Sequence, residues 1–194
     1  MSEDSTQKKQ FRASPRNWEE KTMKKVIYLA AGRAKLNYPN VIYNDYKENR
    51  DLVCDMMDVD LGDYDILIAT PPCNYYSRAN CRRETSTYAQ VTKHLLPDII
   101  DKFIQTGKPF IVENVRNAPL FQKLGLYNKS CLIYTHGRHT YWTNCLFDMS
   151  HISQEFDFRQ IPGYGCVRLK SYVQGGKNVN DVLDYFIEVV LSQK

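Results

Sequence analysis

Short apolar runs, rich in β-branched and aromatic side chains, alternate along this chain with helical patterns and turn residues. Runs of this kind are typical of β-strands, and strands that alternate with helices form βαβ units around a mainly parallel sheet. We therefore predict a three-layer, Rossmann-like α/β fold, in which a twisted sheet carries helices on both faces. The predicted strands are residues 26–30, 40–44, 64–69, 108–113, 130–134 and 139–143.

The clearest helical pattern lies between the third and fourth predicted strands. Apolar residues recur there at helical spacing over residues 91–104, and Gly107 supplies a C-terminal stop. Pro97 falls inside the pattern and predicts either a kink or a fresh helix start. A short helix is expected over about 117–125, and a final helix begins near residue 180.

The connection between the first two predicted strands is unusually short. Residues 31–40 separate them, whereas a parallel crossover normally takes about a dozen residues or more, usually with a helix. We therefore expect the first crossover helix to be shortened or missing.

Length and composition allow one domain with a proper core, since the chain has 194 residues and is 43% apolar. Residues 1–25 gather Lys and Arg among polar residues, which predicts a flexible basic arm ahead of a single domain over 26–194. The formal net charge of +4 permits a polyanionic partner without demanding one.

Cysteines and histidines show no metal-ligand spacing, so no metal site is predicted. Neither a signal-like segment nor an apolar stretch of roughly 20 residues is present. The sequence therefore predicts a soluble, intracellular protein without a membrane partner.

Three chemically useful side chains follow predicted strands: Asp45, Cys73 and Glu113. The carboxyl ends of parallel strands share one edge of a sheet, and active sites gather there. Pro71 and Pro72 hold Cys73 on a stiff, extended turn. A buried, inert thiol is the plain alternative for Cys73 alone. A presented thiol beside a carboxylic acid is suited to covalent attack on an electron-poor ring.

Three segments resemble the cytosine-5 DNA methyltransferases. Residues 72–77 (PCNYYS) are similar to the Pro-Cys-Gln-x-Phe-Ser nucleophile loop of that family, and residues 113–115 match its Glu-Asn-Val segment. Residues 138–144 (RHTYWTN) resemble its later arginine-bearing strand. The resemblance covers roughly residues 26–145 and implies a methyltransferase fold.

The resemblance implies a role for each matched residue. Cys73 is the nucleophile that adds to carbon 6 of cytosine, and Glu113 stabilises the charge that develops at N3. Arg138 holds the neighbouring carbonyl oxygen. Asn114 orders the nucleophile loop through its side-chain amide. A cation such as Arg138 or Arg78, or a helix N-terminus, is expected to lower the pKa of the thiol.

The methyl donor implied by the resemblance is S-adenosylmethionine, bound over the ends of the first strands. The turn after the first strand has Gly32 as its one glycine. Asp45 is the acid for a ribose and Tyr46 the aromatic for an adenine. Asp55 matches the next acidic position, with Asp58 as the competing choice. Pro71, and Asn178 in a loop over residues 174–179, complete the predicted donor site.

A thiol reaches a base in duplex DNA only after the base is flipped out. Residues 74–83 mix aromatic and guanidinium groups suited to stacking and phosphate contact, and an exposed basic loop without a ligand is the plain alternative. The expected DNA contacts are Tyr75, Tyr76, Arg78, Arg82 and Arg83. Too few residues remain for a large target-recognition domain, so site specificity is low, comes from a protein partner, or resides in residues 145–175.

Other interpretations stay open. A reduced methyltransferase scaffold that binds nucleic acid or a base without methyl transfer would explain the glycine-poor turn. A cysteine enzyme acting on free pyrimidine nucleotides would use the same addition at carbon 6. Methylation of exocyclic amines is less well supported, because residues 70–73 (TPPC) lack the polar first and aromatic last residue of that motif.

Overall fold

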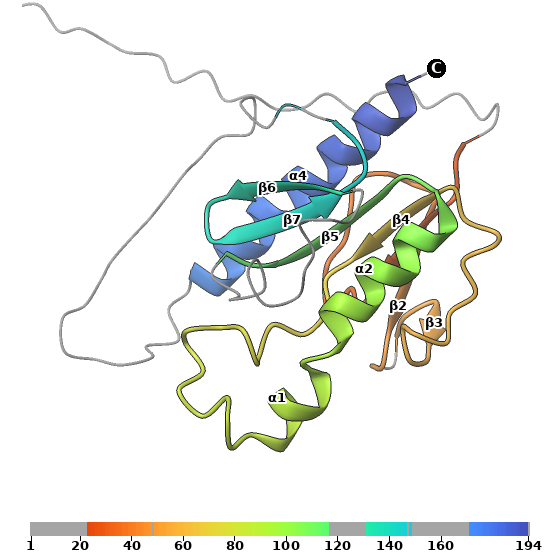
Figure 1. Ribbon diagram of the computed structural model, residues 1–194. Coiled ribbons are helices and arrows are strands. Elements are labelled where there is room, and N and C mark those ends of the chain that lie inside the picture. Colours follow the sequence, from red (N-terminus) through yellow and green to blue (C-terminus); the bar gives the residue numbers. More distant parts are fainter. Residues whose placement is uncertain (1–22, 48, 117–130, 147, 149–170, 194) are drawn as a thin grey trace, which may run out of the picture.

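The computed structural model describes residues 23–47, 49–116, 131–146, 148 and 171–193 (Figure 1). Its centre is a seven-stranded sheet in the order β3-β2-β1-β4-β5-β7-β6. Strands β1 to β5 run parallel, and β7 is antiparallel to both β5 and β6. The strands are β1 (Val26–Leu29), β2 (Val41–Asp45), β3 (Leu52–Val53), β4 (Ile66–Ala69), β5 (Phe110–Val115), β6 (Leu132–His136) and β7 (His139–Thr143).

The strand order reverses beside β1. The chain moves outward from β1 to β2 and β3, then returns to add β4 and β5 on the other side. Open α/β sheets bind ligands beyond the carboxyl ends of the strands at such a switch point. The sheet thus offers one preferred place for a site: Asp45 ends β2, Cys73 lies beyond β4, and Glu113 lies two residues before the end of β5.

The antiparallel hairpin at the sheet edge is the main departure from a parallel sheet. His136 and His139 face each other in register, and Gly137 and Arg138 form the turn between them. Gly137 has a φ of 60°, the left-handed conformation that two-residue hairpin turns require. The strand predicted over 139–143 is present as β7, and the one predicted over 130–134 is present as β6, shifted by two residues. The two strands form one hairpin.

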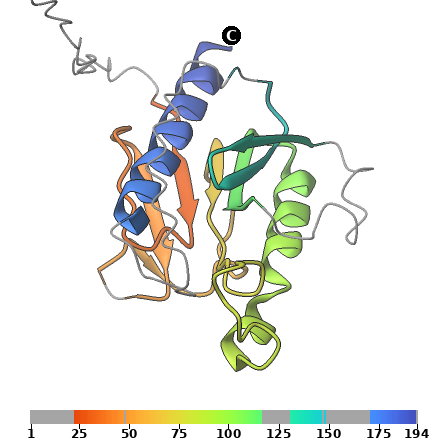
Figure 2. The same ribbon diagram turned by 90° about the vertical axis from the view of Figure 1, so that its left-hand side faces the viewer.

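Three helices lie within the described ranges, and two of them cover opposite faces of the sheet (Figures 1 and 2). Ile99, Ile100 and Phe103 of α2 pack on one face, and Val182 and Phe186 of α4 pack on the other. This gives the mixed α/β layering that was predicted. The helices are α1 (Thr87–Thr92), α2 (Leu95–Thr106) and α4 (Ser171–Ser192).

Of the two outcomes predicted near Pro97, a kink or a fresh helix start, the structure contains the fresh start. Ser86 caps α1 by accepting a hydrogen bond from the Ala89 N–H at 3.3 Å, and α2 begins afresh at Leu95. Pro97 therefore lies in the first turn of α2, where a helix needs no backbone donor. Gly107 ends α2 with a φ of 66°, as the sequence predicted.

The first crossover contains no helix, as expected. Within residues 30–40, Leu36 and Tyr38 are buried against the α4 side of the sheet. Asn37 donates two hydrogen bonds of 2.8 Å to the carboxylate of Asp184 on α4, and the Asn180 amide donates to the Lys35 carbonyl at 3.2 Å. Helix α4 thus covers the face that a first crossover helix would cover.

The start of α4 corrects a prediction. The helix begins at Ser171, not near residue 180, so the expected loop over residues 174–179 is helical and Asn178 lies inside α4. Glycine in a helix interior costs about 1 kcal/mol relative to alanine, and the long buried stripe that follows outweighs this cost. The predicted helix over 117–125 and nearly all of the basic arm lie outside the described residues.

Candidate active site

The loop that carries Cys73 is anchored next to both strands that flank β4. The Thr70 hydroxyl donates to the Ala30 carbonyl at 3.0 Å, which ties the loop to the turn after β1. The buried Asn114 amide donates to the Pro71 carbonyl at 3.0 Å, which ties the loop to β5. Asn114 thus orders the loop as the sequence led us to expect. The carbonyl of Pro71, a residue predicted for donor binding, is engaged in this contact.

Cys73 stands at the start of a turn. Its carbonyl accepts hydrogen bonds from the N–H groups of Tyr76 at 3.0 Å and Ser77 at 2.8 Å. The side chain is half-buried. Burial raises the pKa of the Cys73 thiol, and the nearby Glu113 carboxylate raises it further. The prediction that a neighbouring cation lowers this pKa is therefore wrong. Desolvation and the Glu113 carboxylate both raise it.

Glu113 is buried near the end of β5, with 9% of its surface exposed. Side chains alternate along a strand, so Glu113 and its neighbour Asn114 project to opposite faces of the sheet. Asn114 contacts the Cys73 loop, whereas the Glu113 carboxylate contacts the Nδ1 atom of His139. Burial raises the pKa values of Tyr28 and Tyr141, and the charge of Glu113 raises them further.

The residue that meets Glu113 is His139, one position beyond the predicted Arg138. Arg138 is exposed in the hairpin turn, where its carbonyl accepts a 2.6 Å hydrogen bond from the Arg116 N–H. His139 begins β7, and its side chain shares the face of Tyr141 and Glu113. Sequence reasoning missed His139, although period-two alternation back from Tyr141 would have placed it on this face.

Gly32 and Asp45, both predicted for the methyl donor, are brought together. The Gly32 N–H donates to an Asp45 carboxylate oxygen at 2.7 Å. The φ of Gly32 is 56°, and no atom lies within 4 Å of the position that a Cβ would take. The Arg50 Nε donates to the Gly32 carbonyl at 2.8 Å from the outer side. The turn after β1 is thus fixed, with open space over its glycine.

Tyr46 and Asp55, two further residues predicted for the donor, are also in contact. The Tyr46 hydroxyl donates to the Asp55 carboxylate, which raises the pKa of Tyr46 to about 12 and lowers that of Asp55. The other Asp55 oxygen accepts the Met57 N–H at 2.9 Å. The Tyr46 ring remains 66% exposed. Asp58, the competing acid, is exposed.

Tyr88 on α1 is a second residue that sequence reasoning missed. Burial raises the pKa of its hydroxyl, and the charges of Asp45 and Cys73 raise it further. Tyr88 is thus coupled electrostatically to Asp45 and Cys73, and it is 54% exposed. No motif in the sequence marks this position, because α1 is a short helix reached through a long loop.

The basic loop beyond Cys73 is divided into exposed and buried parts. Tyr75 packs edge-on against Tyr76, with ring centroids 5.2 Å apart and an interplanar angle of 89°. Arg78 and Arg82 are exposed, and Arg83 is half-buried. Tyr76 differs from the expectation of a DNA contact, because it is 6% exposed and its hydroxyl donates to the Lys93 carbonyl. Its ring packs in the core.

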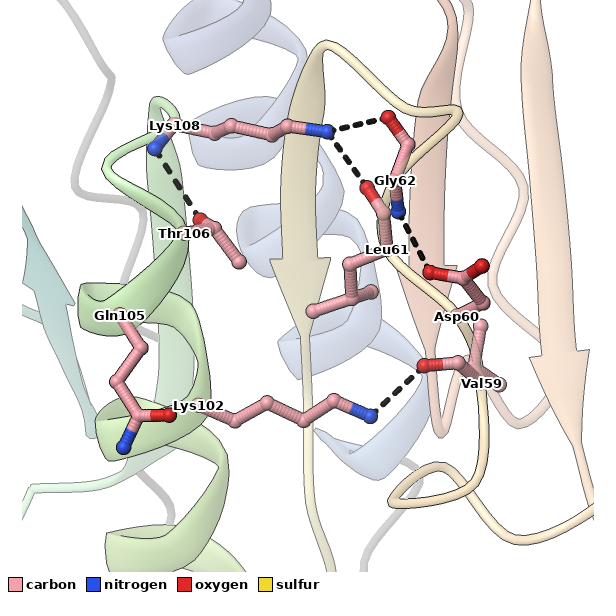
Figure 3. A pocket seen from close by; sticks show the side chains of 8 residues that line it. All are labelled: Val59, Asp60, Leu61, Gly62, Lys102, Gln105, Thr106 and Lys108. Carbon is pink, nitrogen blue, oxygen red and sulfur yellow. Dashed lines mark hydrogen bonds between the residues drawn. The ribbon is translucent and has the colours of Figure 1, made fainter.

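An open pocket of about 530 Å³ lies between α2 and the loop before β4 (Figure 3). Its two lysines bind backbone: the Lys102 ammonium donates to the Met57 and Val59 carbonyls, and that of Lys108 donates to the Leu61 and Gly62 carbonyls. The residues that line the pocket come before β4 and β5 in the chain, so the pocket lies at the opposite edge of the sheet from Cys73. The lysines hold the loop, and the pocket is separate from the candidate site.

Comparisons with known proteins leave the family open. No model of a known protein family matches the chain, and no curated protein is similar to it. Within the described residues, none of the helices has the length and apolar character needed to cross a membrane. In the same residues, no group of three or more His, Cys, Asp or Glu side chains is placed to hold a metal ion.

Proposed function

We propose that the protein is an S-adenosylmethionine-dependent methyltransferase that acts on carbon 5 of cytosine in DNA. One observation carries the proposal: the Asn114 amide of β5 donates to the Pro71 carbonyl, so the Cys73 loop beyond β4 is held at the same edge of the sheet as Glu113 on the adjoining β5. An acid beside a nucleophile is the pair that addition to a pyrimidine ring requires. The ordered loop and the strand order around β1 support the same function.

The chemistry begins with the Cys73 thiolate. Its sulfur forms a bond to carbon 6 of cytosine, and the electrons of the carbon 5–carbon 6 double bond move toward N3, which takes a proton from Glu113. Carbon 5 is then electron-rich enough to accept a methyl group. Afterwards the carbon 5 proton passes to water or another base, the sulfur–carbon 6 bond breaks to return the thiolate, and the N3 proton returns to Glu113.

The residues around the turn after β1 fit the methyl donor. The space over Gly32 admits a ligand close to the backbone, Asp45 has acceptor capacity for ribose hydroxyls, and the exposed Tyr46 ring offers a stacking face. The Tyr46 hydroxyl donates to the Asp55 carboxylate, which holds the Tyr46 ring in place. When bound, S-adenosylmethionine supplies a methyl group on a positively charged sulfur.

The DNA partner is proposed for the loop beyond Cys73. Arg78 and Arg82 are exposed there and Tyr75 is half-buried, so the loop combines an aromatic ring with two phosphate-binding groups. A flipped cytosine then enters between this loop and Glu113. A protein partner that adds sequence specificity belongs to the same proposal.

Hydrogen exchange at carbon 5 of cytosine tests the addition step without the donor. Addition at carbon 6 makes carbon 5 an enamine carbon that takes up deuterium from heavy water, and mass spectrometry of the released nucleoside detects it. We expect exchange on single- or double-stranded DNA, and methylation once S-adenosylmethionine is added. Absence of both reactions on both substrates would refute the proposal.

The second candidate is a binding protein that no longer transfers methyl groups. The raised pKa of Cys73 favours it, because a protonated thiol is a poor nucleophile. This candidate predicts DNA binding without carbon 5 exchange and without binding of radiolabelled S-adenosylmethionine. The exchange experiment and a donor-binding measurement therefore separate the two functions.

A further inference from the structure

The contact between Glu113 and His139 is built into the sheet. The two side chains are 11% and 23% exposed, and the Nδ1 atom of His139 meets a Glu113 carboxylate oxygen. Val115 pairs with His139, and Glu113 pairs with Tyr141, so His139 lies diagonally across from Glu113 on the same face. Strand register therefore holds the imidazole against the carboxylate.

Other polar side chains of the described residues interact electrostatically with this pair. Burial and the carboxylate itself raise the pKa values of Tyr28 and Tyr141, so both hydroxyls are neutral near pH 7. Burial lowers the pKa of His136, the charge of His139 lowers it further, and Asp181 on α4 acts in the opposite direction. Of these described side chains, His139 is the one in hydrogen-bonding contact with Glu113.

The charge on Glu113 matters to Cys73. A carboxylate close to a half-buried thiol opposes its ionisation, whereas a neutral carboxylic acid, or a carboxylate paired with an imidazolium, opposes it much less. Cytosine addition needs a thiolate and an available acidic proton at the same time. A histidine that is hydrogen-bonded to the acid allows the thiolate and the acidic proton to be present together.

We propose that His139 is a positioning residue that shares one proton with Glu113 and thereby lets Cys73 ionise beside the acid. The inference rests on the proposed function for its catalytic meaning. In the addition step, the sulfur–carbon 6 bond forms and N3 takes the proton from Glu113. The resulting carboxylate is then stabilised by the His139 Nδ1–H. When the addition reverses, the proton returns to Glu113 and the thiolate is released.

Site-resolved alkylation of the full-length protein tests this coupling without DNA or donor. Iodoacetamide reacts with thiolates, and mass spectrometry of peptides follows Cys73, exposed Cys81 and buried Cys145 separately. The variants are His139→Ala, His139→Asn, Glu113→Gln and the double variant His139→Ala/Glu113→Gln. Thr135→Ala, an exposed position on β6, is the matched hairpin control. Slow alkylation of Cys145 reports that each variant is folded.

We expect His139→Ala to slow Cys73 alkylation about three- to tenfold at pH 7.5, because Glu113 then keeps an uncompensated charge. His139→Asn keeps an N–H donor near the Nδ1 position and restores part of the rate. Glu113→Gln speeds alkylation, and the double variant matches Glu113→Gln, because His139 acts through Glu113. Cys81 reacts equally in every variant.

Two results would overturn the inference: a His139→Ala rate equal to that of the unsubstituted protein, or an equal slowing by His139→Ala in the Glu113→Gln background. Failure of the methyltransferase proposal looks different. In that case the alkylation pattern holds while no carbon 5 exchange occurs on DNA. If exchange occurs and the alkylation pattern fails, the inference alone is wrong.

Discussion

Two halves of the candidate site are built differently. The addition side, formed by Cys73, Glu113, Asn114 and His139, lies around β4, β5 and β7, and its polar groups are largely buried: Asn114 is 1% exposed and Glu113 9%. The donor side, formed by Gly32, Asp45, Tyr46 and Asp55, lies beyond β1 and β2. Its aromatic group, Tyr46, is 66% exposed.

The difference concerns what holds each side in place. A buried hydrogen bond such as that from Asn114 to Pro71 is expensive to break, because it leaves a polar group without a partner. An exposed contact such as that between Tyr46 and Asp55 exchanges easily with water. The addition side is therefore organised before any ligand arrives. On the proposed function, the donor side gains much of its order from the methyl donor.

The largest expected effect lies on the addition side. Cys73→Ser removes the nucleophile and is expected to lower carbon 5 exchange by on the order of 10³-fold or more, because a serine hydroxyl is far less acidic than a thiol. Circular dichroism should show an unchanged fold. Carbon 5 exchange at the original rate would contradict the contrast between the two sides, since the addition side would then have no role in the chemistry.

Asn114→Leu tests whether burial organises this side. The variant leaves the Pro71 carbonyl without its donor and is expected to lower the free energy of unfolding by about 1–3 kcal/mol in urea denaturation. Carbon 5 exchange falls as well, because the Cys73 loop loses its anchor to β5. Unchanged stability would show that the loop is held by other contacts.

Asp45→Ala tests the donor side. The variant removes the acceptor of the Gly32 N–H and is expected to weaken S-adenosylmethionine binding about tenfold, equivalent to about 1.4 kcal/mol. Isothermal titration calorimetry measures this change. Carbon 5 exchange without the donor should stay at its original rate, and a parallel loss of exchange would mean that the two sides are not separable.

Tyr46→Phe is expected to have the smallest effect. It breaks an exposed hydrogen bond to Asp55 while keeping the aromatic face, so the free energy of unfolding should change by about 0.5 kcal/mol or less. Urea denaturation beside Asn114→Leu makes the comparison direct. A loss as large as that of Asn114→Leu would contradict the contrast between the two sides.

Much of the sheet could be predicted because strand patterns are local. The runs that became β1, β2, β4, β5, β6 and β7 were all located within about two residues at each end, whereas β3 was missed because Leu52–Val53 offers too little pattern. The missing crossover helix followed from the length of residues 31–40 alone. The early start of α4 was missed because Gly175 and Gly176 are typical of loops.

The sequence alone determined that Cys73, Glu113 and Asp45 lie at strand ends of one sheet, because period-two patterns and the rule for parallel strands depend on neighbouring residues only. The tertiary structure decided which side chains meet. Register across β5 and β7 placed His139, not Arg138, against Glu113, and core packing enclosed Tyr76. Tertiary packing also placed α4 over the crossover between β1 and β2, which contains no helix. Contacts of this kind join residues far apart in the chain, so no local pattern encodes them.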